Sequence, residues 1–490
     1  MDHYTDPEGY NCQNLVRASA VVNRQRCASH AVTFRRTAGV HPVKVVHLSV
    51  FNIGDGAANA ADRLHRSLRR LGVDSMMFVA ERRGAVHDPT VTVFRPPMDL
   101  PRRLRRRLRY ELIQRSFSRY RTSRPADYGF FSDDRSPHGT DVLAQLPSGD
   151  LINIHSMYHF VDYWAFFAAV PRHTPVVRTL HDMSFFTGGC HYTWDCDKYT
   201  ARCGACPQLG SHKEKDLSRQ IWRRKHAALE HVVPDRLHLV TPSRWLANEA
   251  QRSSLVRNFP ITVIPLGLDT EVFCPRERGL ARQILRIPPE ARVVLFIAEP
   301  MARPEKGFAL LVRALAGVGQ LSNLLLLSVG SGQPPVEVRV PHLHLGHIGN
   351  ERLLSLVYSA ADVLAIPSVH DNLPQTALEA LACGTPVVGF AVGGIPEIVR
   401  PGITGLLAPA QDVDALRAAV GDLLQEPARR AELAANCRRI AVEEYALEVQ
   451  ARRYLDLYEM ILAGHRPPQQ FACQIYVGHG GDEPRPGSFH

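Results

Sequence analysis

The chain has 490 residues and a mass of 54.6 kDa, with 45% hydrophobic and 22% charged residues, a balance typical of a globular protein of about two to four domains. Its 58 Lys and Arg residues outnumber 48 Asp and Glu residues, and the net charge of +10 favours an anionic partner. The apolar runs are far shorter than the roughly 20 residues that span a bilayer, and the acidic, polar start MDHYTDPEGY does not resemble a secretory signal. We therefore expect a cytoplasmic protein without a transmembrane helix.

Residues 1–42 have no sustained hydrophobic period, and we expect them to form a loose leader. The run VKVVHLSVF, which begins at Val43, predicts a short strand, and a glycine turn and an amphipathic helix ending at Gly72 follow it. This order of strand, glycine turn and helix is typical of the opening of a doubly wound α/β domain. A dinucleotide site needs a third glycine, but the turn continues with Ala-Ala-Asn after Gly56, so an NAD enzyme is the weaker alternative.

The segment Pro101–Arg124 carries many arginines around four apolar residues at near-helical spacing: Leu104, Leu108, Leu112 and Phe117. The pattern predicts a basic amphipathic helix. Such a helix binds anionic membrane surfaces, to which each basic residue contributes about 1 kcal/mol. A solvated surface helix and a nucleic-acid-binding arm are the alternatives.

Ten cysteines in a cytoplasmic protein do not predict a disulfide framework. Four of them lie in a Cys-rich insert, residues 188–210: Cys190, Cys196, Cys203 and Cys206. Four thiolates at short spacings are the ligand set of a closed, tetrahedral structural zinc site, although His191 could replace one sulfur. A redox pair and plain buried cysteines are the alternatives. The other six cysteines are scattered, and we assign them no chemistry.

A second series of apolar strands runs from LHLVTPS to TGLLAPA, with amphipathic helical stretches between several of them. Strands without alternation that are separated by helices predict a parallel sheet covered on both faces. We therefore predict an α/β protein with two tandem Rossmann-like domains that face a central cleft, where the ligand binds beyond the carboxyl ends of the strands. The predicted segments are a first domain over 43–235, a second over 236–446, a terminal helix over 447–464 and a disordered tail over 465–490. The terminal helix either closes the second domain or crosses back onto the first.

The span PSVHDNLPQTALEALACGTPVVGFAVGGIPEIV resembles the donor-site signature of retaining glycosyltransferases of the GT-B fold, family four. That family usually has two glutamates eight positions apart. Here Asp371 stands in place of the first and Glu379 is the second. The DNLP variant and the Cys-rich insert are similar to transferases of colanic acid and exopolysaccharide assembly, and the resemblance extends over roughly Val43–Ala463.

The resemblance implies roles on the donor side. Glu379 binds the ribose hydroxyls, Asp371 approaches the transferred sugar, and Lys306 pairs with the diphosphate, with Arg303 beside it. Three of these residues have a plainer alternative: a helix-surface glutamate for Glu379, a helix N-cap for Asp371 and a solvated loop arginine for Arg303. The remaining donor-site positions are Asn372, Leu373, Gly393 and Gly394.

The first domain supplies the acceptor side. Gly54, Asp55 and Gly56 resemble the glycine loop that lies beside the donor phosphates, although any tight turn between strand and helix has such residues. His155 and His181 each follow a predicted strand, where cleft residues lie. Because His181 is followed by Asp182, we expect His181 to be a catalytic residue that contacts the transferred sugar or the acceptor, with His155 and Asp182 on the acceptor side. A structural histidine is the alternative at either position.

The resemblance implies a retaining hexosyltransferase that uses an NDP-sugar and acts on a lipid-linked oligosaccharide in exopolysaccharide biosynthesis at the inner membrane face. It implies no cofactor for catalysis, because the departing phosphate acts as the base and the cations of Lys306 and Arg303 take the place of a divalent ion. The alternatives are an NAD-dependent or nucleotide-sugar-modifying Rossmann enzyme and a basic, zinc-containing nucleic-acid-binding protein.

Overall fold

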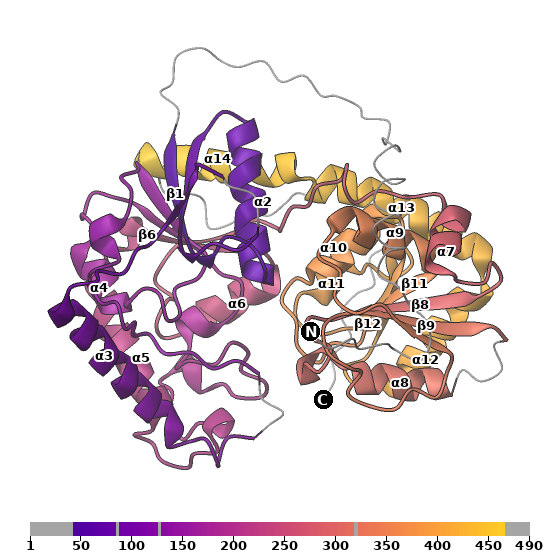
Figure 1. Cartoon of the computed structure of the whole chain (residues 1–490), viewed down its shortest axis with the longest axis horizontal. Helices are drawn as coiled ribbons and strands as arrows, with labels where there is room; N and C mark the ends of the chain where they lie inside the picture. The colour runs from indigo at the N-terminus through magenta and orange to yellow at the C-terminus, as the bar shows by residue number, and fades with distance from the viewer. Residues whose placement is uncertain (1–42, 85–87, 126–128, 318–321, 466–490) are drawn as a thin grey trace, which may run out of the picture.

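The computed structural model describes residues 43–84, 88–125, 129–317 and 322–465. The expectations of a loose leader over 1–42 and of a disordered tail, His465 apart, lie outside the described residues. Within the described ranges the chain forms two α/β halves, one indigo to magenta and the other orange to yellow in Figure 1, as the sequence predicts.

The first half contains a seven-stranded sheet in the order β3-β2-β1-β4-β5-β6-β7, and every neighbouring pair of strands is parallel. The strands are β1 (Lys44–Phe51), β2 (Asp74–Glu81), β3 (Val91–Val93), β4 (Leu151–Ile154), β5 (Val176–Thr179), β6 (Leu237–Thr241) and β7 (Ile261–Val263). The second half contains a parallel six-stranded sheet in the order β10-β9-β8-β11-β12-β13. Its strands are β8 (Arg292–Ile297), β9 (Leu324–Val329), β10 (His342–His344), β11 (Val363–Ile366), β12 (Val387–Phe390) and β13 (Gly405–Ala408).

Helices connect the strands and cover the sheets. The α-helices are α2 (Gly56–Arg70), α3 (Leu100–Ser118), α4 (Tyr163–Ala169), α5 (Leu217–Leu229), α6 (Arg244–Arg252), α7 (Arg278–Leu285), α8 (Phe308–Ala316), α9 (Glu351–Ala360), α10 (Gln375–Ala382), α11 (Ile395–Ile398), α12 (Val413–Gln425), α13 (Pro427–Tyr445) and α14 (Leu447–Leu462). Short 3-10 turns lie at η1 (Leu143–Gln145), η2 (Ser184–Phe186), η3 (Lys198–Thr200), η4 (Pro207–Leu209), η5 (Pro234–Arg236) and η6 (Pro304–Lys306).

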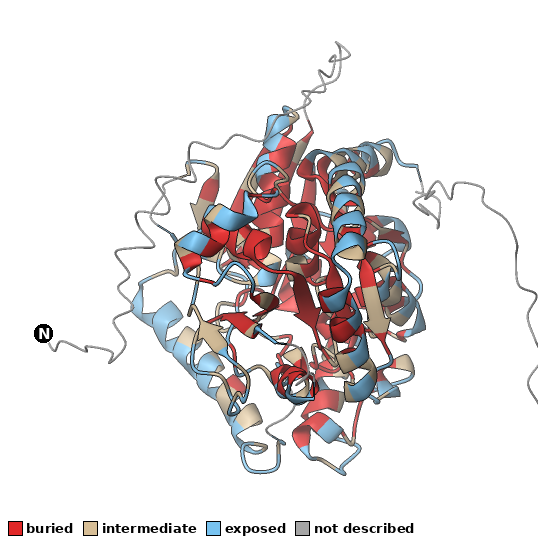
Figure 2. Cartoon of the chain, turned by 90° about the vertical axis from the view of Figure 1, so that its right-hand side faces the viewer, coloured by how far each residue is buried: buried red, intermediate tan, exposed pale blue. Residues whose placement is uncertain are grey.

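Burial explains why the strands read as continuous apolar runs. Every residue of β4, β5, β11 and β12 is buried, because helices pack on both faces of each sheet. Figure 2 shows the sheets as a buried centre, with exposed residues on the outer faces of the surrounding helices. Local signals also match the structure: Asp55 caps the N-terminus of α2 by accepting from the Ala58 amide at 2.8 Å, and Gly72 follows the helix in the left-handed region.

The predicted domain boundary at 235/236 is too early. β6 pairs with β5, and β7 pairs with β6, so the first sheet extends to Val263. Both strands are buried parallel strands like those that follow them, and an apolar run does not indicate which of two similar sheets it joins.

Helix α14 crosses back onto the first half, which decides between the two predicted positions of the terminal helix. It packs against α2, and it lies over the first half in Figure 1. Its Tyr458 hydroxyl accepts a hydrogen bond from the Asn153 side chain at 2.7 Å, and its Tyr454 hydroxyl lies 3.0 Å from the Thr179 hydroxyl. The last helix therefore ties the two halves together.

Helix α3 confirms the helix predicted in the basic segment, and it lies on the outside of the first half. Its contacts with the body include Arg109, which pairs with Asp162, the buried Ile113, and Phe117, whose ring packs edge-on against Phe131. By contrast, Leu104 and Leu108 are 66% and 59% exposed, so these leucines face solvent among the arginines. No helix among the described residues is long and apolar enough to span a bilayer.

Candidate functional site

The candidate site lies where the strand order of each sheet reverses. The first sheet switches between β1 and β4, and the second switches between β8 and β11. Ligands of open parallel sheets bind at such switch points, beyond the carboxyl ends of the strands. The segments that follow these four strands contain Gly54, His155, Lys306 and Asp371, so sequence-predicted residues flank both switch points.

Lys306 and Asp371 form an ion pair at the second switch point. The Lys306 Nζ lies 2.6 Å from the Asp371 Oδ2, and the Ser368 hydroxyl donates to the same oxygen at 3.3 Å. Gly307 holds the two loops together, because it has φ +72° and a Cβ there would lie 1.9 Å from the Pro367 carbonyl oxygen. The structure therefore brings together two residues that the sequence placed 65 positions apart.

Arg303 is engaged elsewhere in the same loop. Its Nε donates to the Glu305 carboxylate at 2.7 Å, and its guanidinium lies 5.6 Å from the centre of the Phe130 ring. Glu305 is buried, and its backbone carbonyl accepts from the Val369 amide at 2.9 Å. Arg303 thus neutralises a buried carboxylate that links the Lys306 loop to the Asp371 loop.

Glu379 lies on α10 and is buried, with a partner on each carboxylate oxygen. The Arg63 Nη2 lies 2.9 Å from one oxygen, and the Tyr358 hydroxyl donates to the other at 3.0 Å. Burial raises the pKa of Glu379, while the Arg63 charge opposes that rise. Neither partner was predicted from the sequence. The sequence offered one indication for Arg63: it is a charged residue beside Leu64, on the face of α2 that the apolar residues form.

Three histidines form a buried chain that leads from β1 to the end of β5. The His47 Nδ1 lies 3.0 Å from the His155 Nε2, and the His155 Nδ1 lies 3.2 Å from the His181 Nε2. Burial lowers the pKa of all three imidazoles, with nearby charge adding to the effect, and the pKa of His181 falls to about 4. At neutral pH the three rings are therefore uncharged. His155 and His181 were predicted site residues, whereas His47, which lies inside strand β1, was not.

The Asp182 carboxylate is bound by two neighbouring protein groups. Its carboxylate accepts from the Ser184 amide at 2.7 Å and lies 2.8 Å from the His191 Nδ1. Burial alone would raise the pKa of Asp182, but these hydrogen bonds and the His191 charge outweigh burial and lower it. The other ring nitrogen of His191 lies 3.1 Å from the Ser132 hydroxyl, so both of its nitrogens are engaged away from the cysteines.

Asn372 joins the carboxyl ends of the two sheets. Its amide donates to the His181 carbonyl at 3.1 Å, and its carbonyl oxygen accepts from the Ser243 hydroxyl at 2.5 Å. Glu397 makes a second link, because its carboxylate accepts from the Arg244 and Trp245 amides at 2.9 Å, at the N-terminus of α6. Asn372 therefore contacts protein groups of the opposite half, and the neighbouring Leu373 is buried.

The glycines at 393 and 394 pack against the loop that holds Asp371. A Cβ on Gly393 would lie 1.8 Å from the Asp371 carbonyl oxygen, and one on Gly394 would lie 1.8 Å from the Asn372 carbonyl oxygen. The Gly394 amide also donates to the Asp371 carbonyl at 3.2 Å. In this structure the two glycines thus permit the approach of protein backbone.

The glycine turn of the first half contacts the second half directly. The Gly56 carbonyl accepts from the Gln375 side chain at 2.5 Å, and Asp55, besides capping α2, accepts from the Tyr158 hydroxyl at 3.3 Å. Gly54 has φ +110°, a value that L side chains rarely adopt. The turn therefore lies at the interface between the halves, next to α10.

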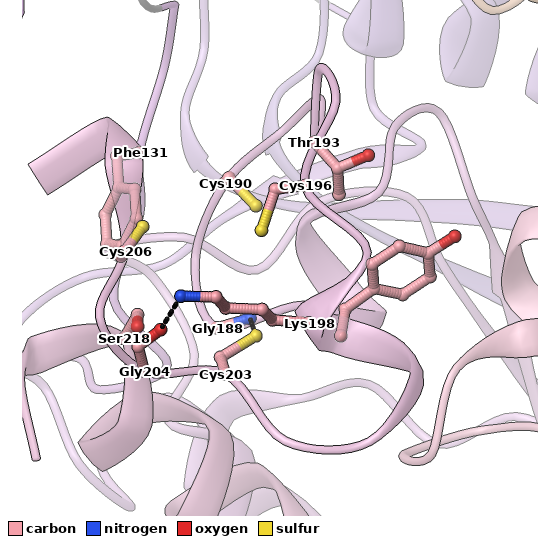
Figure 3. A pocket seen from close by; sticks show the side chains of 11 residues that line it. Phe131, Gly188, Cys190, Thr193, Cys196, Lys198, Cys203, Gly204, Cys206 and Ser218 are labelled. Carbon is pink, nitrogen blue, oxygen red and sulfur yellow. Dashed lines mark hydrogen bonds between the residues drawn. The ribbon is translucent and has the colours of Figure 1, made fainter. Parts of the chain in front are cut away.

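The four cysteines of the Cys-rich insert line one small cavity, which Figure 3 shows. They are free thiols, and three of them are buried, with Cys196 half-buried. In the described part of the chain, no three His, Cys, Asp or Glu side chains are placed as a finished metal-ligand set.

Both halves match glycosyltransferase family models. Residues 139–272 match a model described as Glycosyltransferase Family 4, and residues 291–426 match one described as Glycosyl transferases group 1. Together the two ranges take in more than half of the chain. The chain belongs with the family 4 glycosyltransferases of the GT-B fold.

Curated relatives of this family 4 chain include a D-inositol 3-phosphate glycosyltransferase of Actinosynnema mirum, 37% identical over 36% of this chain and 46% of that protein. They also include an MMP alpha-(1->4)-mannosyltransferase of Mycolicibacterium hassiacum, 32% identical over 45% of this chain and 55% of that protein. The chain spans about half the length of these curated relatives.

Solved structures show the same fold at low sequence identity. Sucrose-phosphate synthase from Thermosynechococcus elongatus superposes with a TM-score of 0.60 at 22% identity, covering 86% of this chain and all of that one. Anabaena Alr3699/HepE in complex with UDP-glucose gives a TM-score of 0.57 at 16% identity, covering 85% of this chain and 99% of that one. The predicted two-domain GT-B fold is thus confirmed.

Proposed function

We propose that this chain transfers a hexose from a nucleoside diphosphate sugar to an acceptor hydroxyl, with retention at the anomeric carbon. The observation that carries the proposal is the pair of carboxylates at the two ends of one short segment: Asp371, which holds Lys306, and Glu379, buried on the following helix. The likeness in fold to Alr3699/HepE, whose structure contains UDP-glucose, supports a nucleotide sugar as the donor.

In this mechanism Lys306 binds the diphosphate and stabilises the negative charge that grows on it as the bond from the anomeric carbon to the phosphate oxygen breaks. The acceptor oxygen forms its bond to the anomeric carbon on the same face. The proton of the acceptor hydroxyl passes to the departing phosphate oxygen, so the step needs no protein nucleophile and no added co-reactant. Arg303 contributes through the loop that it holds.

Glu379 retains acceptor capacity for the ribose hydroxyls. A carboxylate has about four lone-pair sites, and Arg63 and Tyr358 use one on each oxygen. The Arg63 charge also opposes the rise in the pKa of Glu379 that burial causes, which favours the charged form as a hydrogen-bond acceptor. Asp371 positions the Lys306 ammonium until the diphosphate binds.

We further propose a lipid-linked oligosaccharide acceptor in exopolysaccharide biosynthesis and peripheral binding at the cytoplasmic face of the inner membrane. The exposed leucines and arginines of α3 support a membrane surface as the site of action. The chain is basic, as a protein that binds anionic lipid often is. The inositol phosphate and mannosyl transfers in the relatives' names concern those proteins, and they make small phosphorylated polyols useful competitors in an acceptor screen.

Nucleotide binding tests this proposal most directly. We expect UDP or GDP to raise the melting temperature of the chain, and Lys306→Ala to abolish that shift. Lys215→Ala is the matched control, because Lys215 is exposed and lies on another part of the surface. The proposal fails if no nucleoside diphosphate stabilises the protein, and DNA binding with a steep salt dependence would then favour a nucleic-acid-binding protein.

A further inference from the structure

The Cys-rich insert encloses a cavity of about 10 Å³, the size that admits about one water-sized probe. All four cysteine side chains of the insert line it, together with Lys198 and Tyr199 (Figure 3). A cavity of this size has no room for an organic cofactor or a substrate, but it has room for a single ion.

The four cysteines come from different turns of the insert. Cys190 and Cys196 lie between η2 and η3, and Cys203 and Cys206 lie between η3 and η4. Their side chains nevertheless line the same cavity. Four unrelated cysteines would not need to converge in this way, so their placement indicates a common function.

A backbone N–H group points at one of the sulfurs. The Gly188 amide donates to the Cys203 Sγ at 3.1 Å. A thiol is a weak acceptor, whereas a metal-bound thiolate is a strong one, and outer hydrogen bonds of this kind orient metal ligands. The backbone is thus arranged for a thiolate at Cys203.

The turn between Cys203 and Cys206 brings both side chains to the same side. Gly204 and Ala205 have φ values of +147° and +43°, which reverse the chain within two residues. The Lys198 ammonium holds this turn by donating to the Ala205 carbonyl at 2.8 Å. A tight turn in a C-x-x-C segment is the usual way in which two neighbouring ligands reach one metal ion.

The surroundings also supply positive charge. The Lys225 side chain is buried and donates to the Thr187 carbonyl at 3.1 Å, next to the Gly188 amide that donates to Cys203. A zinc ion with four thiolates has a net charge of −2, and a buried ammonium nearby lowers the cost of burying that charge.

We propose that the insert binds one Zn²⁺ as a closed, structural tetrathiolate site. Each thiol loses one proton and forms one Zn–S bond of about 2.3 Å, and no electron transfer takes place. The four side chains do not form a finished ligand set in the described residues. Binding of the ion would require the sulfurs to turn inward by rotation about their Cα–Cβ bonds. The four ligands are Cys190, Cys196, Cys203 and Cys206.

The ion would shape the donor side of the interface. The same insert carries Tyr192 and Trp194, whose rings lie 6.2 Å and 4.6 Å from the ring of His370, next to Asp371. A bound ion that orders the insert would therefore also hold these two aromatic rings in place beside the Lys306–Asp371 pair. This consequence rests on the proposed function, but the metal site itself does not.

The test is the metal content of the full chain purified without added chelator. We expect about one zinc per chain, and Co²⁺ exchange should give the intense sulfur-to-cobalt absorption of a tetrahedral thiolate site. Cys203→Ser and Cys206→Ser should lose the metal. Cys383→Ser should retain it, because this buried cysteine lies in the second half and hydrogen-bonds to Ser355.

Two results would overturn the proposal: folded wild-type protein without stoichiometric metal, or a disulfide between any two of the four cysteines in the protein as purified. If the serine variants do not fold, a strong chelator applied to the wild-type chain decides the question by releasing zinc in a one-to-one ratio. Nucleotide stabilisation is measured separately, so a failed metal site and a failed transferase are distinguishable.

Discussion

Arg63 and Glu379 form an ion pair between two buried side chains that come from different halves of the chain. Removing one partner of such a pair leaves the other charge buried without compensation, and we expect Arg63→Met to lower the free energy of unfolding by about 3–5 kcal/mol. Arg66→Met is the matched control on the same helix, because Arg66 is half-exposed and pairs with Asp62. Urea denaturation of the two variants measures the difference.

The loss in Arg63→Met should depend on pH. Burial raises the pKa of Glu379 above that of the unfolded chain, and without Arg63 the pKa rises further. A carboxyl group with a raised pKa in the folded state stabilises the fold at low pH, and this contribution is lost as the pH rises through the folded pKa. The variant should therefore lie closer to the wild type at pH 4 than at pH 7, and an equal loss at both values would contradict the assigned ion pair.

The tautomers of the three chained histidines follow from the surroundings of His47, the first of them. The His47 Nε2 is buried and has no hydrogen-bond partner. A buried acceptor without a partner is better tolerated than a buried N–H, so His47 holds its proton on Nδ1 and donates to His155, which in turn donates to His181. His181 then holds its proton on Nδ1, and ¹⁵N shifts of its ring nitrogens measure this tautomer.

The same histidines make stability depend on pH. Their pKa values are lowered in the fold, so their contribution is full above about 6.5, the pKa of an unperturbed histidine, and is lost as the pH falls toward the folded values. We expect His47→Leu to reduce the slope of unfolding free energy against pH between 4 and 6.5, by at most about 1.4 kcal/mol per pH unit. His231→Leu should leave the slope unchanged, because that side chain is 78% exposed.

At the scale of single elements, α3 combines a buried Ile113 with two leucines, Leu104 and Leu108, that are exposed to solvent. We expect the double variant Leu104→Glu, Leu108→Glu to lose binding to vesicles that contain anionic lipid, because it removes buried apolar area and adds repulsive charge. Val442→Glu on α13 is the control, a substitution at a similarly exposed apolar side chain in the other half. Co-sedimentation with anionic and neutral vesicles measures the effect, and equal binding by the two variants would remove α3 as the membrane contact.

The elements themselves were largely predictable, and their partners were not. Uninterrupted apolar runs such as LLLLSV predicted buried parallel strands because helices cover both faces of each sheet. The same property misassigned β6 and β7, since two similar sheets leave the same pattern in the sequence. The basic segment gave a helix, but only the structure shows that Leu104 points outward while Ile113 points inward.

For the whole molecule, residues within one segment could be predicted and contacts between the halves could not. Asp371 and Glu379 lie eight positions apart in one continuous motif, so a family signature in the sequence is enough to identify both. Arg63 and Tyr358 reach Glu379 from α2 and α9. The residues next to them in the sequence give no indication that Glu379 is their partner. The crossing of α14 likewise depends on the shape of the assembled first half.

Helix α14 makes the two halves unfold together, and its aromatic side chains allow that coupling to be tested. Tyr458 is fully buried against the first half, and truncating a buried aromatic side chain costs about 3–5 kcal/mol. We expect wild-type protein to melt in one calorimetric transition and Tyr458→Ala to melt in two, of which UDP or GDP raises the one that belongs to the second half, because Lys306 and Glu379 lie there. Tyr110→Ala, at a half-exposed tyrosine of α3, should keep a single transition. If Tyr458→Ala still melts as one unit, the interface contacts of Arg63 and Asn372 suffice to couple the halves without α14.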